Sequence, residues 1–305
     1  MQLSVVIITF NEEANIGRTL ESVQPLVADG KGEIIVVDSG STDRTPEIAK
    51  SFGAKVFVEE WKGFAAQKNS AIEKAEWGWI LSLDADECID ADMAELIRGL
   101  ISRPDGQAPR QMQRAASSDN ADSLETVEKV MALEEALDEP FAKSAEEIPV
   151  ALSGYWFPRK NYFLGGWIKH GGFWPDRKLR LFRRGYGRFE ARAVHETVKV
   201  DGYTAKVKRG AIIHHSYPTL SGYIDHMNRY SSLGAEMVVA KGKVRFSFMN
   251  IVLRPMFTFI YNYFLRLGFL DGREGLLLHL YHAVYVSWKY AKAWELHRQK
   301  TTLSS

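Results

Sequence analysis

LSVVIITF, residues 3–10, is a nearly continuous run of apolar and β-branched side chains. Such a run is typical of a strand covered on both faces, as in a parallel sheet. Three similar runs follow: EIIVVD at 33–38, AKVFVE at 54–59 and WILSLD at 79–84. The first 84 residues therefore predict four buried strands.

Helices are expected between these strands. Asn11 is predicted to cap the helix after the first strand. Thr45 is predicted to cap the helix after the second strand, which Gly53 should end. A third helix is expected over 64–75. Strands that alternate with helices across short links predict βαβ units and an α/β fold with a doubly wound, mostly parallel, Rossmann-like sheet.

Polar side chains cluster where the predicted strands end, which is the edge where such sheets bind ligands. These side chains are Thr9, Asn11, Glu12, Asp38, Asp84 and Asp86. No G-x-G-x-x-G pattern follows the first strand, so binding of a dinucleotide is disfavoured.

The pair Asp84 and Asp86 points to a divalent cation. Residues at positions i and i+2 of an extended chain face the same way, so both carboxylates are expected to face one ligand. Two carboxylates about 5 Å apart repel by roughly 3 kcal/mol at an effective dielectric of about 20. Mg²⁺ or Mn²⁺ would offset that repulsion, with substrate phosphates completing its coordination. Asp38 in the same crevice strengthens the prediction.

Charge is distributed unevenly along the 305 residues, although the net charge is only +1. Residues 1–154 hold 14 Lys and Arg against 29 Asp and Glu, whereas residues 155–305 hold 25 against 9. A basic half suggests an anionic partner such as a phosphate or an anionic lipid surface. The single cysteine, Cys88, and the absence of a cleavable leader in MQLSVVIITF favour the cytoplasm.

Two regions depart from the strand–helix pattern. Residues 103–149 are polar and poor in aromatic side chains, which predicts a disordered insert within a domain spanning 1–219. Residues 220–305 are expected to form a helical region. Its apolar runs, Pro255–Leu265 and Gly275–Trp288, are shorter than the about 20 residues of a spanning helix. They are expected either to lie in a membrane interface or to pack on the sheet domain or another subunit.

Four motifs in the first hundred residues carry a family resemblance. They are VVIITFNEEANI, IIVVDSGSTDRT, GFAAQKNSAI and ILSLDADE. In this order they resemble the successive motifs of family 2 inverting glycosyltransferases with the GT-A fold. GGWIKHGGFWPDRKLRLFRR, AVHE and FLRLGFLDGREG are similar to a branch that contains lipopolysaccharide core β-1,4-glucosyltransferases. The insert is absent from the usual pattern.

The resemblance implies a role for each residue at the strand ends. Thr9, Asn11 and Glu12 would line the nucleotide pocket. Asp38 would hydrogen-bond the uracil or ribose, and Lys68 and Asn69 would lie near the nucleotide. Asp84 would contact the ribose or sugar, and Asp86 would bind the metal on the donor diphosphate.

Inverting transfer also needs a base that takes the proton of the acceptor hydroxyl. Glu196 in RAVHET is the first candidate and Asp176 in FWPDRK the second. His195 is expected to orient Glu196, ligate the metal or touch phosphate, or else to be a packed histidine. Arg180 offers a guanidinium fork suited to the diphosphate or the acceptor.

The resemblance thus implies a metal-dependent inverting transferase that moves a hexose, with glucose as the first candidate, from a UDP-sugar. The acceptor would be a lipid-linked saccharide, such as the heptose of a lipopolysaccharide inner core, at the cytoplasmic face of the inner membrane. Two alternatives stay open. One is transfer to polyprenyl phosphate or protein, and the other is a non-catalytic protein that binds nucleotide-sugars. Nucleic acid is not expected as a partner.

Overall fold

The computed structural model describes residues 2–102, 152–190, 197–242, 244 and 246–303. The predicted insert at 103–149 and the residues Glu196 and His195 lie outside them. The chain divides into two compact units. The first combines Met1–Arg159 with Arg177–Ile213, and the second combines Lys160–Asp176 with His214–Ser305. The second unit thus takes in a stretch of the predicted 1–219 domain as well as the helices expected from 220.

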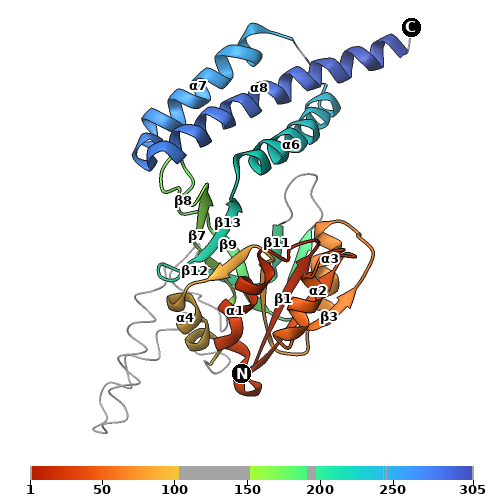
Figure 1. The fold of residues 1–305 in the computed structure, drawn as a ribbon, viewed down its shortest axis with the longest axis vertical. Coiled ribbons are helices and arrows are strands. Elements are labelled where there is room, and N and C mark those ends of the chain that lie inside the picture. Colours follow the sequence, from red (N-terminus) through yellow and green to blue (C-terminus); the bar gives the residue numbers. More distant parts are fainter. Residues whose placement is uncertain (1, 103–151, 191–196, 243, 245, 304–305) are drawn as a thin grey trace. The chain divides into compact units, whose positions relative to one another are not determined.

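The first unit is built on a seven-stranded sheet with the order β12-β6-β9-β4-β1-β2-β3. Its strands are β1 Leu3–Thr9, β2 Gly32–Asp38, β3 Lys55–Val58, β4 Trp79–Asp84, β6 Leu152–Phe157, β9 Lys178–Arg183 and β12 Tyr203–Lys206. The first four strands run parallel, as predicted, and β9 runs antiparallel to both β4 and β6. The predicted doubly wound, mostly parallel sheet is confirmed (Figure 1).

Helices cover both faces of this sheet (Figure 1). They are α1 Ile16–Val27, α2 Thr45–Ser51, α3 Phe64–Glu73 and α4 Ala91–Ile101, with a short 3-10 turn at Ala28–Gly30. Alternate residues of β1 enter different cores. Val5 packs in the cluster that includes residues of α1 and α4, and Val6 packs in the cluster that includes residues of α3. This two-sided burial explains why the opening run of the sequence is almost entirely apolar.

The predicted cap at Asn11 is wrong. Helix α1 begins at Ile16 with Asn15 at the N-cap position, and Asn11 has a positive φ of 53°. The Asn11 Oδ1 instead accepts a hydrogen bond of 2.8 Å from the backbone of Thr42. Thr45 is the first residue of α2 rather than its cap. Both side chains join loops at the sheet edge, so the local capping rule does not apply to them.

Short strands complete the first unit. Strand β5 covers Glu87–Ile89, and β10 (Gly187–Glu190) pairs antiparallel with β11 (Thr197–Val200). Two further strands, β7 (Arg159–Phe163) and β13 (Ile212–Tyr217), run across the boundary into the second unit.

The second unit is helical apart from the β7–β8 hairpin, whose second strand is Gly166–Trp167, and the end of β13. Its helices are α6 Leu220–Ala240, η3 Met249–Leu253, α7 Arg254–Ile260, η4 Tyr261–Leu265, η5 Gly268–Asp271 and α8 Gly272–Leu303. Phe163, Ile168, Tyr223 and Leu278 form its small core. None of the described helices combines the length and the apolarity required to cross a bilayer.

Candidate active site

The carboxyl ends of β1 and β2 lie side by side. The Ser39 backbone N–H donates to the Thr9 carbonyl over 2.9 Å. The hydroxyls of Thr9 and Ser39 are both buried and have no hydrogen-bond partner among the described residues. A buried hydroxyl without a partner costs free energy, about 1–3 kcal/mol, so such groups usually serve a ligand or an ordered water. This edge therefore offers two hydroxyls for a polar ligand.

The loops after β1 and β2 are held together by hydrogen bonds. The backbone N–H of Asn11 donates to Ser41 Oγ over 2.8 Å, and that of Glu12 donates to Thr45 Oγ1 over 2.8 Å. Asp38, only 1% exposed, accepts hydrogen bonds from the backbone of Gly40 and Ser41. The sequence places these small polar residues where they fix the rim of the crevice. Whether Asp38 also binds uracil or ribose stays a prediction.

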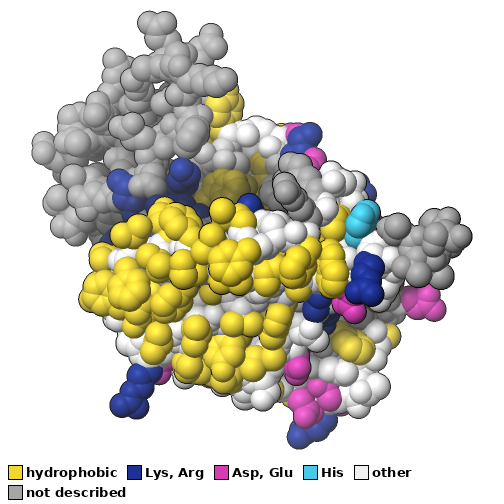
Figure 2. Space-filling model, turned by 90° about the horizontal axis from the view of Figure 1, so that it is seen from above, with side chains coloured by type: hydrophobic (Ala, Val, Ile, Leu, Met, Phe, Trp, Pro, Cys, Tyr) yellow, Lys and Arg dark blue, Asp and Glu magenta, His cyan; other side chains and the backbone are white. Residues whose placement is uncertain are grey.

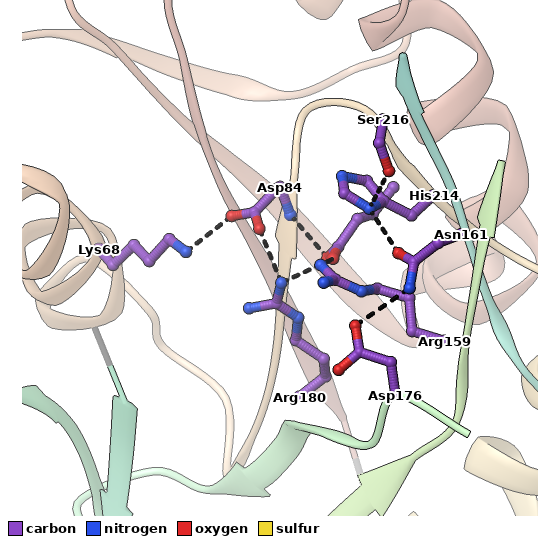
Figure 3. Close-up of polar contacts among 9 residues, drawn as sticks. Lys68, Asp84, Arg159, Asn161, Asp176, Arg180, His214 and Ser216 are labelled. Atoms are coloured by element: carbon purple, nitrogen blue, oxygen red, sulfur yellow. Dashed lines mark hydrogen bonds and ion pairs between the residues drawn. The ribbon is translucent and has the colours of Figure 1, made fainter. Parts of the chain in front are cut away.

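Asp84, at the end of β4, forms ion pairs with two basic side chains (Figure 3). Its Oδ1 lies 2.7 Å from Lys68 Nζ, and its Oδ2 lies 2.7 Å from Arg180 Nη2. Burial favours the neutral acid, but the charges of Arg180 and Lys68 outweigh it and hold the pKa of Asp84 far below its usual range. Asp84 is therefore a fixed, ionised carboxylate at the sheet edge.

Glu87, which was not predicted as a site residue, supports this arrangement through hydrogen bonds. Its side chain is fully buried, and its Oε1 accepts hydrogen bonds from Arg180 over 2.7 Å and from Arg159 over 2.9 Å. Its Oε2 accepts the backbone N–H of Asp84 over 3.1 Å. The only signal in the sequence is a charged residue that opens the otherwise apolar stretch Glu87–Ile89.

Arg180 is 6% exposed and donates hydrogen bonds to the carboxylates of Asp84 and Glu87. Burial disfavours its charge, but Asp84 and Glu87 more than compensate and raise the pKa of the guanidinium. The contact of Arg180 with the diphosphate or acceptor stays a prediction. The structure shows Arg180 as the link between two acidic side chains.

Asp86 does not extend β4, because the chain turns at Ala85 and Asp86. The expectation that Asp84 and Asp86 face one ligand as i and i+2 residues of an extended strand is therefore wrong in its geometry. Asp86 nevertheless influences Glu12. Burial raises the pKa of Glu12 most, and the hydrogen bond from Asn15 opposes the rise. The carboxylates of Asp86, Asp43 and Asp84 raise it further.

This acidic mouth, defined as Glu12, Asp84 and Asp86, fits a divalent cation. The charge of Asp84 is already neutralised by Lys68 and Arg180, which leaves Glu12 and Asp86 as the oxygen donors. No group of three or more His, Cys, Asp or Glu side chains encloses a metal site in the described part of the chain. One or two carboxylates together with substrate phosphates are the usual ligands of Mg²⁺, so the residues present fit that ion.

Proteins with similar sequences are glycosyltransferases. Residues 4–123 match the family model described as "Glycosyl transferase family 2". Over 98% of its length the chain is 28% identical to "Lipopolysaccharide core biosynthesis glycosyltransferase LpsC" of Rhizobium meliloti, of which it covers 94%. This chain is a glycosyltransferase whose residues 4–123 match family 2.

Other similarities of this glycosyltransferase are local. An "Uncharacterized glycosyltransferase" of Rickettsia bellii is 46% identical over 96 residues, which are 32% of this chain and 31% of that protein. The solved glucosyl-3-phosphoglycerate synthase of Mycobacterium tuberculosis, in complex with Mn²⁺, UDP and glucosyl-3-phosphoglycerate, is 28% identical. The match covers 33% of this chain and 38% of the synthase with a TM-score of 0.28. This transferase thus spans about a third of both relatives.

The other predicted site residues of the transferase take part in different contacts. Lys68 is 3% exposed, so it is not a solvent-facing helix residue, and Asn69 exchanges two hydrogen bonds with the backbone of Phe189. In the second unit, Asn161 Nδ2 donates to Asp176 over 3.2 Å, and Asn161 Oδ1 lies 3.0 Å from His214 Nδ1. Asp176 is therefore a carboxylate with a positioned amide partner. The two base candidates stay predictions.

Proposed function

We propose that this glycosyltransferase moves a hexose from a UDP-sugar to a lipid-linked saccharide with inversion at the anomeric carbon. Glucose is the hexose that we propose first. The acceptor would be a sugar such as the heptose of a lipopolysaccharide inner core, presented at the cytoplasmic face of the inner membrane. The similarity to LpsC over nearly the whole chain supports the acceptor class. The observation that carries the proposal is the acidic mouth at the sheet edge, in which Lys68 and Arg180 hold Asp84 ionised.

In the proposed donor site, the hydroxyls of Thr9 and Ser39, which have no partner among the described residues, would form hydrogen bonds with the nucleotide. Glu12 and Asp86 would hold Mg²⁺ or Mn²⁺, which supplies positive charge that offsets the charge of the departing diphosphate. Lys68 and Arg180 keep Asp84 ionised and in place, so its two oxygens are oriented before the donor arrives. Such preorganisation avoids a reorganisation cost during the reaction.

The acceptor hydroxyl must lose its proton as its oxygen attacks the anomeric carbon. We assign this step to Glu196, with Asp176 as the second candidate. The basic composition of residues 155–305 would favour an acceptor that carries phosphates in an anionic lipid surface.

Asp86→Ala tests the donor site. UDP should stabilise the unmodified protein against heat only weakly without Mn²⁺ and more strongly with it, and the variant should lose the Mn²⁺-dependent part together with turnover. Asp29→Ala, a change of an exposed carboxylate in the short turn after α1, is the matched control. Wild-type turnover by Asp86→Ala would exclude the metal role. Product analysis with heptose-containing, polyprenyl phosphate and protein acceptors distinguishes the acceptor classes.

A further inference from the structure

The second unit exposes a concentrated apolar surface. Of the 23 exposed large hydrophobic residues found in the described part of the chain, 15 lie between Phe246 and Leu280. Figure 2 shows hydrophobic side chains covering a broad, continuous area of the face turned toward the viewer. Single exposed apolar residues are ordinary, but a contiguous patch of this kind usually marks an interaction site.

The exposed residues repeat at helical spacing along η3, α7 and η4. They are Met249, Val252, Met256, Phe257, Ile260, Tyr261, Phe264 and Leu265. We call this set the open face. Steps of three and four residues, with adjacent pairs, place these side chains along one side of the helical segment 249–265.

The opposite side of the same segment is covered by α8. The Ser287 hydroxyl donates to the carbonyl of Ile251 over 2.9 Å, and Arg254 donates to the hydroxyl of Tyr290 over 2.7 Å. Pro255, Met256 and Phe259 line a hollow of about 370 Å³ together with residues of α8, so Met256 lies where the open face meets α8. The segment is therefore apolar on two sides, and α8 covers only one of them.

The charges around the open face are of one sign. Between Glu236 and Asp271 the sequence has five Lys and Arg and no Asp or Glu. The second unit as a whole has 13 Lys and Arg against 6 Asp and Glu. A second copy would bring the same positive charge, which disfavours self-association through this face. An anionic lipid surface has the complementary charge, and each basic residue near it adds to the attraction.

We propose that the open face lies in the headgroup and upper acyl region of an anionic phospholipid bilayer and anchors the protein there without spanning it. An apolar helix side with Phe and Tyr, flanked by Arg and Lys, is the composition of an interfacial helix. The inference deepens the proposed function, because it assigns a surface that would keep the transferase beside a lipid-linked acceptor. It depends on the exposed side chains of the second unit and not on the sugar chemistry.

Vesicle sedimentation with the full-length protein tests the anchor. The wild type should sediment with vesicles of equimolar phosphatidylcholine and phosphatidylglycerol, and less with pure phosphatidylcholine. Phe257 and Leu265 are 62% and 67% exposed, so Phe257→Gln with Leu265→Gln removes apolar surface without adding charge. This variant should bind at least about tenfold more weakly. Leu233→Gln, which changes a 38% exposed leucine of α6, should stay within about twofold.

Three kinds of result would overturn the proposal. One kind comes from the vesicle assay: the wild type fails to bind anionic vesicles, or the double variant binds them as strongly as the wild type does. Another is complete release at high salt, where the Debye length falls from about 10 Å to about 3 Å, because an inserted face should stay bound. The third is a wild-type dimer that the double variant dissociates, which would make a second copy the occupant. UDP-sugar binding by thermal shift, measured on every variant, reports separately on the proposed donor site.

Discussion

Replacing Glu87 by Gln should weaken both the fold and the donor site. The substitution keeps the shape of the side chain but removes the charge that faces Arg180 and Arg159. Gln has one oxygen and one NH₂ group, so it cannot accept from both arginines and also from the backbone N–H of Asp84. One donor must face the new NH₂ group.

The magnitude follows from the burial of this network. Removing one partner of a buried ion pair costs about 3–5 kcal/mol, and the isosteric Gln, which retains one acceptor, should stay near the low end at about 3 kcal/mol. At roughly 2–4 °C per kcal/mol, the midpoint of thermal unfolding should fall by about 6–12 °C. A shift of Asp84 by even 1 Å should reduce kcat/KM for the donor by about 100-fold.

Glu33→Gln is the matched control. Glu33 is 9% exposed and accepts hydrogen bonds from Ser4, Lys55 and the backbone of Glu76, and it lies at the start of β2, the opposite end from Asp38. Burial acts to raise its pKa, but the hydrogen bonds from Lys55 and Glu76 lower it below the ordinary value. This variant should lose stability while kcat/KM for the donor stays within about twofold. Calorimetry and initial-rate kinetics with a UDP-sugar provide both readouts. Unchanged kcat/KM in Glu87→Gln, or an equal loss in both variants, would refute the positioning role of Glu87.

Two further predictions concern protons. Burial lowers the pKa of His279 to about 4. Between about pH 6.5 and about pH 4, His279 is therefore protonated in the unfolded chain but neutral in the folded chain. Acidification across this range should reduce the free energy of unfolding by up to about 3 kcal/mol. His279→Gln should flatten the unfolding midpoint across that window, and an unchanged slope would contradict the assignment. Glu196→Gln should keep UDP-sugar binding, measured by thermal shift, and lose at least about 100-fold in transfer rate, whereas Asp176→Asn should stay near wild type. The reverse pattern would move the base to Asp176.

The sequence predicted the parts of the fold that depend on local patterns. Four strands, their order along the chain and the polar residues at their ends follow from side-chain periodicity and from the rule that ligands bind at strand ends. Asn11 was misread as a cap because its partner, Thr42, is distant in the sequence. Short polar side chains can serve a helix or a neighbouring loop, and local pattern cannot choose between them.

The hydrogen-bond network around Asp84 could not be predicted from local patterns either, because its members are distant in the sequence. Glu87 is separated from Arg159 by 72 residues and from Arg180 by 93, so only the folded sheet brings them together. The turn at Asp86 was also missed, because an apolar run predicts a strand better than it predicts where the strand stops. The residue types at the strand ends were thus foreseen, but the pairing of Lys68 and Arg180 with Asp84 was not.

The division of the chain into units has a consequence for protein engineering. The backbone passes from one unit to the other after Arg159, after Asp176 and after Ile213, so neither unit is a single continuous segment. A truncation after residue 219 would keep Phe163 of β7 and Ile168 just after β8 but remove Tyr223 and Leu278, against which they pack. Deletion of the helices should therefore yield a fragment with an incomplete core and exposed apolar side chains, which favours aggregation. Chimeras between relatives need at least three crossover points, one at each passage of the chain between the units.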